Sequence, residues 1–180
     1  MAASNTSVSR RSFLKTAAMA GGGLMISFGW IQSVAQTGAA SINAANEFTV
    51  INGFLKIASN GVITIMSPNP EGGQNVKTSM PMIVAEELDV DWKEIVVEQA
   101  HLDTKYYTRQ FIGGSQAIRQ NWKTLRTAGA SARHMLCMAA AQSWQVPIGE
   151  ITTERGVIHH KSSGKSAAYG TMASAAAGLE

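Results

Sequence analysis

Residues 71–88 read EGGQNVKTSMPMIVAEEL, a turn with two glycines that leads directly into an apolar repeat. The apolar side chains recur at helical spacing, which predicts a helix over residues 76–88. Pro81 costs a helix about 3 kcal/mol in its interior. We therefore expect either that Pro81 lies in the first turn, with Thr78 or Ser79 as the capping residue, or that the helix is kinked there.

A second junction of the same kind lies at Gly113-Gly114-Ser115. It opens the longest helix that the pattern predicts, over residues 115–143. Gly129 and Ala132 leave little side chain in the middle of its apolar face, so another backbone can approach closely there. The expected apolar face consists of Ile118, Trp122, Leu125, Gly129, Ala132, Leu136 and Ala140. The basic residues off this face are interpreted as a solvated surface: Arg119, Lys123, Arg126 and Arg133.

The other elements follow from alternating apolar residues and from turn residues such as Asn60-Gly61 and Arg155-Gly156. They are hairpins over 54–66 and 151–160, a short strand over 95–98, a loop over 101–111 and a helix over 169–179. The chain therefore predicts an α+β fold, in which hairpins and a short mixed sheet pack on two main helices.

The charge of the chain is concentrated at its N-terminus. Lys+Arg number 15 and Asp+Glu 12 in 180 residues. Arg10, Arg11 and Lys15 account for the surplus, so residues 36–180 carry no net charge and nothing indicates a nucleic-acid partner. Cys137 is the only cysteine, which excludes an internal disulfide and a four-cysteine iron–sulfur site.

Arg10 and Arg11 lie in the stretch SRRSFLK, ahead of an apolar, glycine-spaced run over residues 16–30. This pattern predicts a twin-arginine signal, which exports folded proteins. The alternative is a chance basic tail before a short membrane anchor, but the glycines at 21–23 dilute the run below what a spanning helix needs. We expect a periplasmic location or one at the periplasmic face of the inner membrane. The predicted parts are a signal peptide over 1–35, a linker over 36–46 and a folded domain over 47–180.

The two glycine junctions are the candidate binding site. The N-terminus of a helix has unpaired N–H groups and a partial positive charge, so it attracts anions such as phosphate. Gln74 can offer an amide donor and an acceptor to a heterocycle or a metal-oxo group. We predict that Gly73, Gln74, Gly114 and Ser115 converge on one concave surface. The full set of candidate residues is Gly72, Gly73, Gln74, Asn75, Gly113, Gly114 and Ser115. The alternative is that both are ordinary turns without a ligand.

Other motifs are weaker candidates. Gly164-Lys165-Ser166 resembles the end of a P-loop, but His159 stands where that motif needs another glycine. On a strand, His159 and His160 point to opposite faces and so do not share one metal ion easily. Cys137 between apolar neighbours is interpreted as a buried residue and not as a nucleophile.

Residues 70–92 resemble the segment around the Glu-Met-Gly-Gln-Gly motif of the molybdenum hydroxylases, the xanthine dehydrogenase and aldehyde oxidoreductase family. Residues 113–144, GGSQAIRQNWKTLRTAGASARHMLCMAAAQSW, are similar to the helix that follows in the same subdomain. With the export signal, the similarity is greatest to the branch with the isoquinoline 1-oxidoreductase beta subunit and membrane-associated aldehyde dehydrogenases. It runs from about Arg10 to Leu179 and matches the N-terminal quarter or so of such a subunit.

This resemblance implies hydroxylation of an aldehyde or N-heterocycle at carbon, with water as the oxygen source. It implies a molybdenum ion held by a pterin dithiolene with a cytosine dinucleotide tail. It also implies a partner subunit with [2Fe–2S] clusters, often followed by a cytochrome c. Gly73 and Gln74 match the family motif, and Gly114 and Ser115 match the loop before the next helix. Gly72 stands in place of the usual methionine and Asn75 in place of the usual second glycine, although asparagine also tolerates a positive φ.

The family's catalytic glutamate and its Gly-Gly-Gly-Phe-Gly loop lie far downstream of the matching region. We therefore expect residues 47–180 to be a C-terminally truncated part of a larger molybdopterin-binding domain, with no catalytic residue and no activity alone. A non-catalytic periplasmic binding or interaction domain that retains the fold is the alternative function.

Overall fold

The computed structural model describes residues 48–179. The signal peptide with Arg10 and Arg11, and the linker over 36–46, lie outside the described residues, so both stay predictions. The helices of the described part are α3 (Val76–Leu88), α4 (Ala117–Trp144) and α5 (Tyr169–Ala177), with 3₁₀ turns η1 (Trp92–Glu94), η2 (Ile148–Glu150) and η3 (Lys161–Ser163). The strands are β1 (Phe48–Asn52), β2 (Leu55–Ala58), β3 (Ile63–Ser67), β4 (Val96–Gln99), β5 (Ile151–Glu154), β6 (Val157–His160) and β7 (Lys165–Ala168).

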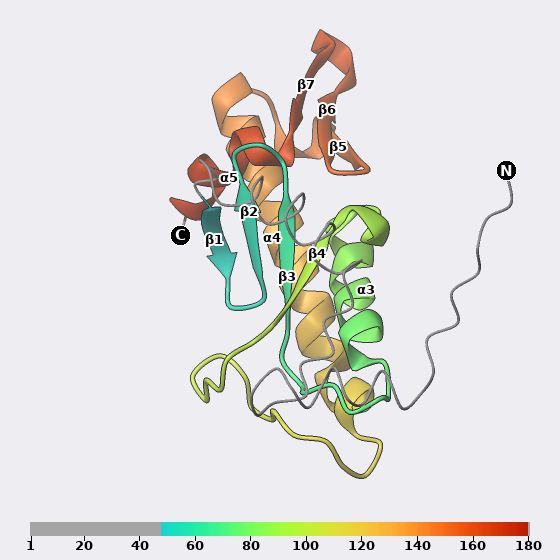
Figure 1. Cartoon of the computed structure of the whole chain (residues 1–180). Coiled ribbons are helices and arrows are strands. Elements are labelled where there is room, and N and C mark those ends of the chain that lie inside the picture. Colours follow the sequence, from blue (N-terminus) through green and yellow to red (C-terminus); the bar gives the residue numbers. More distant parts are fainter. Residues whose placement is uncertain (1–47, 180) are drawn as a thin grey trace, which may run out of the picture. The chain divides into compact units, whose positions relative to one another are not determined.

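The strands form two sheets (Figure 1). The first has four strands in the order β1-β2-β3-β4, with antiparallel pairs except for β4, which runs parallel to β3. The second is an antiparallel meander of β5, β6 and β7. Both predicted hairpins are confirmed, and their turns contain Gly61 at φ 92° and Arg155-Gly156 at φ 48° and 77°. The α+β prediction is thus confirmed.

The parallel pair places the two glycine junctions at one end of the domain. β3 continues into α3 and β4 continues into α4, each through a connecting loop. Because the carboxyl ends of parallel strands meet at the same edge of a sheet, the loops over 68–75 and 100–116 leave from neighbouring positions. Figure 1 shows both loops at the lower end of the sheet, where α3 and α4 also begin.

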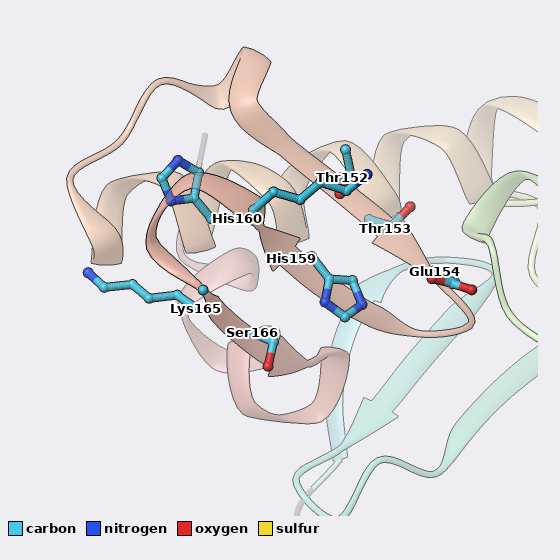
Figure 2. A pocket seen from close by; sticks show the side chains of 9 residues that line it. Thr152, Thr153, Glu154, His159, His160, Lys165 and Ser166 are labelled. Atoms are coloured by element: carbon cyan, nitrogen blue, oxygen red, sulfur yellow. The ribbon is translucent and has the colours of Figure 1, made fainter.

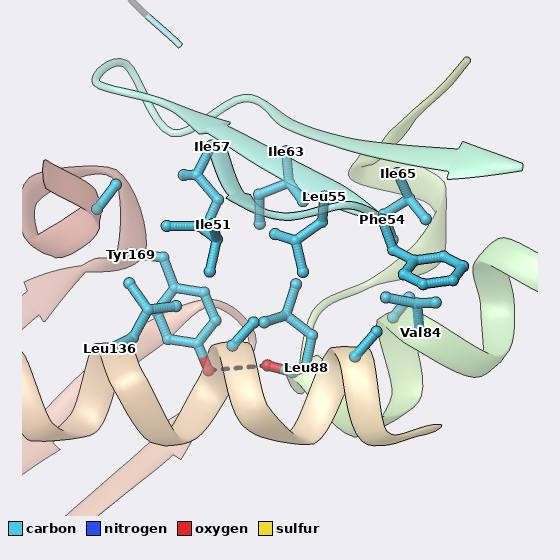
Figure 3. Close-up of a cluster of buried hydrophobic side chains, with 14 of the residues drawn as sticks. Ile51, Phe54, Leu55, Ile57, Ile63, Ile65, Val84, Leu88, Leu136 and Tyr169 are labelled. Carbon is cyan, nitrogen blue, oxygen red and sulfur yellow. Dashed lines mark hydrogen bonds between the residues drawn. The ribbon is translucent and has the colours of Figure 1, made fainter. Parts of the chain in front are cut away.

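The core lies between the four-stranded sheet and the helices (Figure 3). Leu55, Ile57 and Ile65 from the sheet are buried together with residues of α3 and α4. The two helices approach each other closely at Gly129, because a Cβ placed there would lie 2.9 Å from the Cβ of Glu87 and close to the Val84 carbonyl. The expectation that another backbone approaches at Gly129 is confirmed.

One of the two alternatives for Pro81 and one detail of the apolar face of α4 are wrong. α3 begins at Val76 after the N-cap Asn75, and Pro81 lies inside it instead of in a first turn capped by Thr78 or Ser79. The ring of Pro81 removes one backbone hydrogen bond of α3 and crowds the carbonyl of Lys77, and its buried side chain adds to the packing. Trp122 was expected on the apolar face of α4, but its side chain is 49% exposed, and Asn121 is buried instead.

Among residues 48–179, no helix combines the length and the apolarity that a membrane crossing requires.

Candidate functional site

The two glycine turns border one hollow of about 440 Å³. Gln74 lines it from the turn before α3, and Gly113, Gly114 and Ser115 line it from the turn before α4. The turns also touch, since a Cβ at Gly72 would lie 2.8 Å from Cδ1 of Ile112. The predicted convergence is therefore confirmed for Gln74, Gly114 and Ser115, whereas Gly73 does not line this hollow.

Each turn depends on left-handed backbone conformations. φ is 97° at Gly73 and 61° at Asn75 in the first turn, and 61° at Gly114 and 50° at Ser115 in the second. Asparagine adopts this region more readily than most other non-glycine residues do. The first turn thus keeps a positive φ at Asn75, the position where the resemblance has glycine.

Buried amide side chains hold the two loops together. Asn69 is 1% exposed, and its Nδ2 donates a hydrogen bond of 3.0 Å to the Phe111 carbonyl. Its Oδ1 accepts a longer hydrogen bond, 3.4 Å, from Nδ2 of Asn121 in α4. Gln110 adds a bond of 3.2 Å from its Nε2 to the Pro68 carbonyl. The relative position of the turns is therefore fixed by side chains that sequence reasoning did not single out.

The first turn is capped by a carboxylate of its own. Glu71 accepts hydrogen bonds from the amides of Gly73 at 2.7 Å, Asn75 at 3.0 Å and Lys77 at 3.2 Å. The Lys77 amide is the largest cause of a lowered pKa of Glu71, and the amides of Asn75, Gly73 and Gln74 lower it further against the effect of burial. The amide groups that the sequence offers to a phosphate at the start of α3 are thus already in contact with an anion.

The side-chain amide of Gln74 is held in one orientation. Its Oε1 accepts a hydrogen bond of 2.7 Å from the Gly72 amide, and its Nε2 donates one of 2.9 Å to the Pro70 carbonyl. An amide oxygen accepts two hydrogen bonds and an NH₂ group donates two. Gln74 therefore keeps one acceptor and one donor position for a ligand in the hollow.

The second turn, before α4, has no carboxylate cap. The N-cap of α4 is Gln116, which makes no capping hydrogen bond through its side chain, and the first turn contains no acidic residue. Arg119 reaches back to Oε1 of Gln116 through Nη2 at 2.6 Å, and Nη1 of Arg109 contacts Oε1 of Gln120 at 2.7 Å. The uncapped helix N-terminus favours an anion here, and the two guanidinium groups add positive charge nearby, although neither arginine lines the hollow itself.

Arg109 and Arg119 were not among the predicted site residues. Arg109 lies in the loop that precedes α4, and Arg119 was assigned to the solvated face of the helix. The spacing of three between Gln116 and Arg119 is the signal that could have placed Arg119 at the turn.

The other candidate residues do not form a site of this kind. Within residues 48–179, no group of three or more His, Cys, Asp or Glu side chains is arranged to hold a metal ion. Cys137 is half-buried, and burial raises the pKa of its thiol. This agrees with its interpretation as a packed residue.

Comparison with known proteins places the chain among molybdopterin-binding proteins and their relatives. The family model described as a molybdopterin cofactor-binding domain matches residues 7–180. The beta subunit of isoquinoline 1-oxidoreductase from Brevundimonas diminuta is 37% identical over 127 residues, which are 67% of this chain and 16% of that protein. The membrane-bound aldehyde dehydrogenase [pyrroloquinoline-quinone] from Gluconacetobacter polyoxogenes is 27% identical over 170 residues, 92% of this chain and 21% of that protein.

Solved structures agree on the fold. Quinoline 2-oxidoreductase from Pseudomonas putida 86 superposes with a TM-score of 0.51 at 16% identity, over 82% of this chain and 22% of that one. The chain thus spans less than a quarter of the length of each of these proteins.

Proposed function

This chain belongs to the molybdopterin cofactor-binding domains of the molybdenum hydroxylase family, and from that premise we propose that the hollow between its two glycine turns receives part of the cofactor. The observation that carries the proposal is the meeting of both turns at the carboxyl ends of the parallel strands β3 and β4. Sites for bulky anionic ligands in sheets of this kind occupy this position.

The two sides of the hollow suit different parts of such a ligand. The uncapped start of α4, with Gly114, Ser115 and the nearby Arg119, suits a phosphate group. The amide of Gln74 suits a heterocycle that needs one donor and one acceptor. At the start of α3 a second phosphate would compete with the Glu71 carboxylate, so we assign the phosphate to α4. The bound cofactor would supply the oxidation of a substrate carbon, with water as the source of oxygen.

The wider assignment follows the relatives. The names of the two curated relatives point to an N-heterocycle and to an aldehyde, so we propose one of these as the substrate class of the whole subunit. We further propose a cytosine dinucleotide form of the cofactor, a small partner subunit with [2Fe–2S] clusters and a cytochrome c as electron acceptor. These features rest on the resemblance of residues 70–92 and 113–144.

Export belongs to the same proposal. Arg10 and Arg11 form the twin-arginine pattern, which fits a cofactor inserted before translocation and a periplasmic location. Fractionation of cells that express the wild type and an R10K/R11K variant tests this. The variant should accumulate in the cytoplasm, and equal periplasmic amounts of both proteins would refute export by this route.

The cofactor site is tested by replacing Gln74. The subunit is expressed at the length of its relatives together with the small subunit, as wild type, Gln74→Ala and Gln142→Ala. Gln142 is an exposed glutamine near the other end of α4, and serves as the matched control. Gln74→Ala should lower the molybdenum content per heterodimer while the protein stays soluble, and Gln142→Ala should leave it near one. Equal molybdenum content in all three proteins would remove Gln74 from the site.

One observation favours the alternative of a non-catalytic binding domain. The carboxylate of Glu71 fills the anion position at the start of α3, which a domain without a cofactor would also show. Metal analysis of the wild-type complex separates the two functions, because the alternative predicts no molybdenum. Sequencing the gene beyond the codon of Glu180 adds an independent check, since the enzyme requires the family's downstream glutamate.

A further inference from the structure

A groove of about 660 Å³ lies at the surface between α3 and α4. Met82 and Ile83 line it from α3, and Ile118 and Trp122 line it from α4. Met82 is 39% exposed and Trp122 is 49% exposed, although large apolar side chains are mostly buried in folded proteins. The described residues therefore leave a contiguous apolar surface open between the two helices.

This surface continues an apolar repeat that the core uses only in part. Ile118 and Trp122 belong to the apolar face that the sequence predicts for α4, and Leu125 on the same face is fully buried. The spacing of four between Ile118 and Trp122 places both side chains on one side of the helix. A regular apolar repeat that extends beyond the buried core indicates a surface that another element covers.

The hollow over the sheet of β5, β6 and β7 is a different kind of surface. Figure 2 shows polar and charged side chains around it, and its lining consists of Thr, Ser, His, Lys, Glu and Gly residues. Side chains of these types stay solvated on ordinary protein surfaces without a partner. Of these two hollows, the groove between the helices is therefore the one that indicates an interaction.

We propose that the groove between α3 and α4 is the docking surface for a further part of the same subunit, beyond the residues of this chain. The chain aligns with 16% and 21% of the lengths of its curated relatives, so most of such a subunit lies outside it. A segment of the same polypeptide has a high effective concentration at the groove and competes well with a separate protein. A second copy of this chain fits less well, because a groove that meets its own copy about a twofold axis leaves the hollow unfilled.

The charges at the groove define the chemistry of the covering segment. Arg126 and Glu87 form a salt bridge with each other. Glu86 also lines the groove, and it is exposed and makes no salt bridge within the described residues. The covering segment is thus convex, with an apolar side chain that packs on Trp122 and Met82 and a Lys or Arg side chain that reaches Glu86.

Hydroxyl-radical oxidation followed by mass spectrometry tests the proposal. The experiment compares the 180-residue chain with the subunit expressed at the length of its relatives. Trp122 and Met82 should react in the short chain and lose most of that reactivity in the long subunit. His159, in the polar hollow of Figure 2, is the reference and should react equally in both proteins.

Two substitutions at the groove provide a second measurement. Glu86→Lys should lower the melting temperature of the long subunit, because it places two positive charges opposite each other, and should leave the short chain as stable as before. Trp122→Ser should lower the melting temperature of the long subunit by more than that of the short chain. Glu154→Lys, at the polar hollow, is the matched control and should have the same small effect in both proteins.

Several results would overturn the proposal. Protection of Trp122 in the short chain identifies a second copy if it grows with protein concentration, and residues 1–47 if it does not. Protection that appears only after the small subunit is added identifies that subunit as the partner. Equal reactivity of Trp122 in the short chain, the long subunit and the complex means that the groove stays open. A long subunit that protects Trp122 but lacks molybdenum would count against the cofactor site alone and would support the docking surface.

Discussion

At the scale of single residues, Tyr169 joins the last helix to α3. Its buried hydroxyl donates a hydrogen bond of 2.8 Å to the Leu88 carbonyl (Figure 3). Tyr169→Phe leaves that carbonyl without this partner and should lower the free energy of unfolding by about 1–2 kcal/mol. Urea denaturation at neutral pH measures the change.

The same hydroxyl predicts a dependence on alkaline pH. Burial raises the pKa of Tyr169 well above its ordinary value of 10.0. Between the pKa of the unfolded chain and that of the folded protein, only the unfolded chain loses the proton, so stability falls as the pH rises above 10. In the Tyr169→Phe variant, stability should fall less steeply as the pH rises. The variant should keep part of this loss of stability at alkaline pH, because burial also raises the pKa of Tyr107. If the free energy of unfolding falls equally steeply with pH in wild type and variant, this prediction is wrong.

Glu71 affects the stability of the fold at acid pH. Amide hydrogen bonds lower its pKa from 4.5, so its carboxylate stabilises the fold at higher pH and loses that effect as the pH falls through the lowered value. Glu71→Gln should therefore lower the melting temperature at pH 7, and the difference should shrink as the pH falls below 4.5. Glu94→Gln, at another exposed glutamate, is the control. A difference between wild type and Glu71→Gln that persists at acid pH would show that the charge is not what caps α3.

At the scale of elements, the contact of α3 with α4 depends on Gly129. Alanine gains about 1 kcal/mol of helix propensity over glycine. However, the added methyl group would meet the Val84 carbonyl and the Leu88 amide of α3, which are backbone atoms and cannot turn aside. Gly129→Ala should therefore lose about 1–3 kcal/mol of stability in urea denaturation.

Gly149→Ala is the matched control, because a Cβ at Gly149 has no neighbour within 4 Å. Its stability should stay within about 0.5 kcal/mol of the wild type. A stable Gly129→Ala variant would show that the two helices can separate without loss.

The element predictions succeeded where the signal is local. The turns at Asn60-Gly61 and Arg155-Gly156 define their hairpins, and the spacing of apolar residues defines α3. β7 was missed because its residues, KSAA, have little preference for a strand and are held there by pairing with β6. Trp122 was misplaced because the apolar face of α4 is replaced near its start by the buried Asn121, whose partner Asn69 is distant in the sequence.

At the scale of the whole molecule, the convergence of the glycine turns follows from the direction of one strand. The sequence contains a strand, a helix and a second strand over residues 62–98, and such a unit favours parallel pairing. The parallel direction of β4 can therefore be predicted from the order of these elements in the sequence. The capping of α3 by Glu71 could not be predicted from the sequence. A glutamate four residues before Asn75 has no fixed position relative to a helix that starts after a left-handed turn.

The joining of the two strand–helix units is itself testable. Asn69 follows β3, and Asn121 lies 52 residues later in α4. Asn69→Ala removes a buried side chain and its hydrogen bond to the Phe111 carbonyl, and should cost about 1–3 kcal/mol in urea denaturation. Asn60→Ala, at an exposed hairpin turn, should cost less. If the buried pair couples the units, Asn121→Ala should cost less in the Asn69→Ala background than in the wild type, by about 0.5 kcal/mol or more. Additive losses would mean that the Asn69–Asn121 pair does not couple the two units, and that the other contacts between the loops, such as the bond from Gln110 to the Pro68 carbonyl, hold the turns in place.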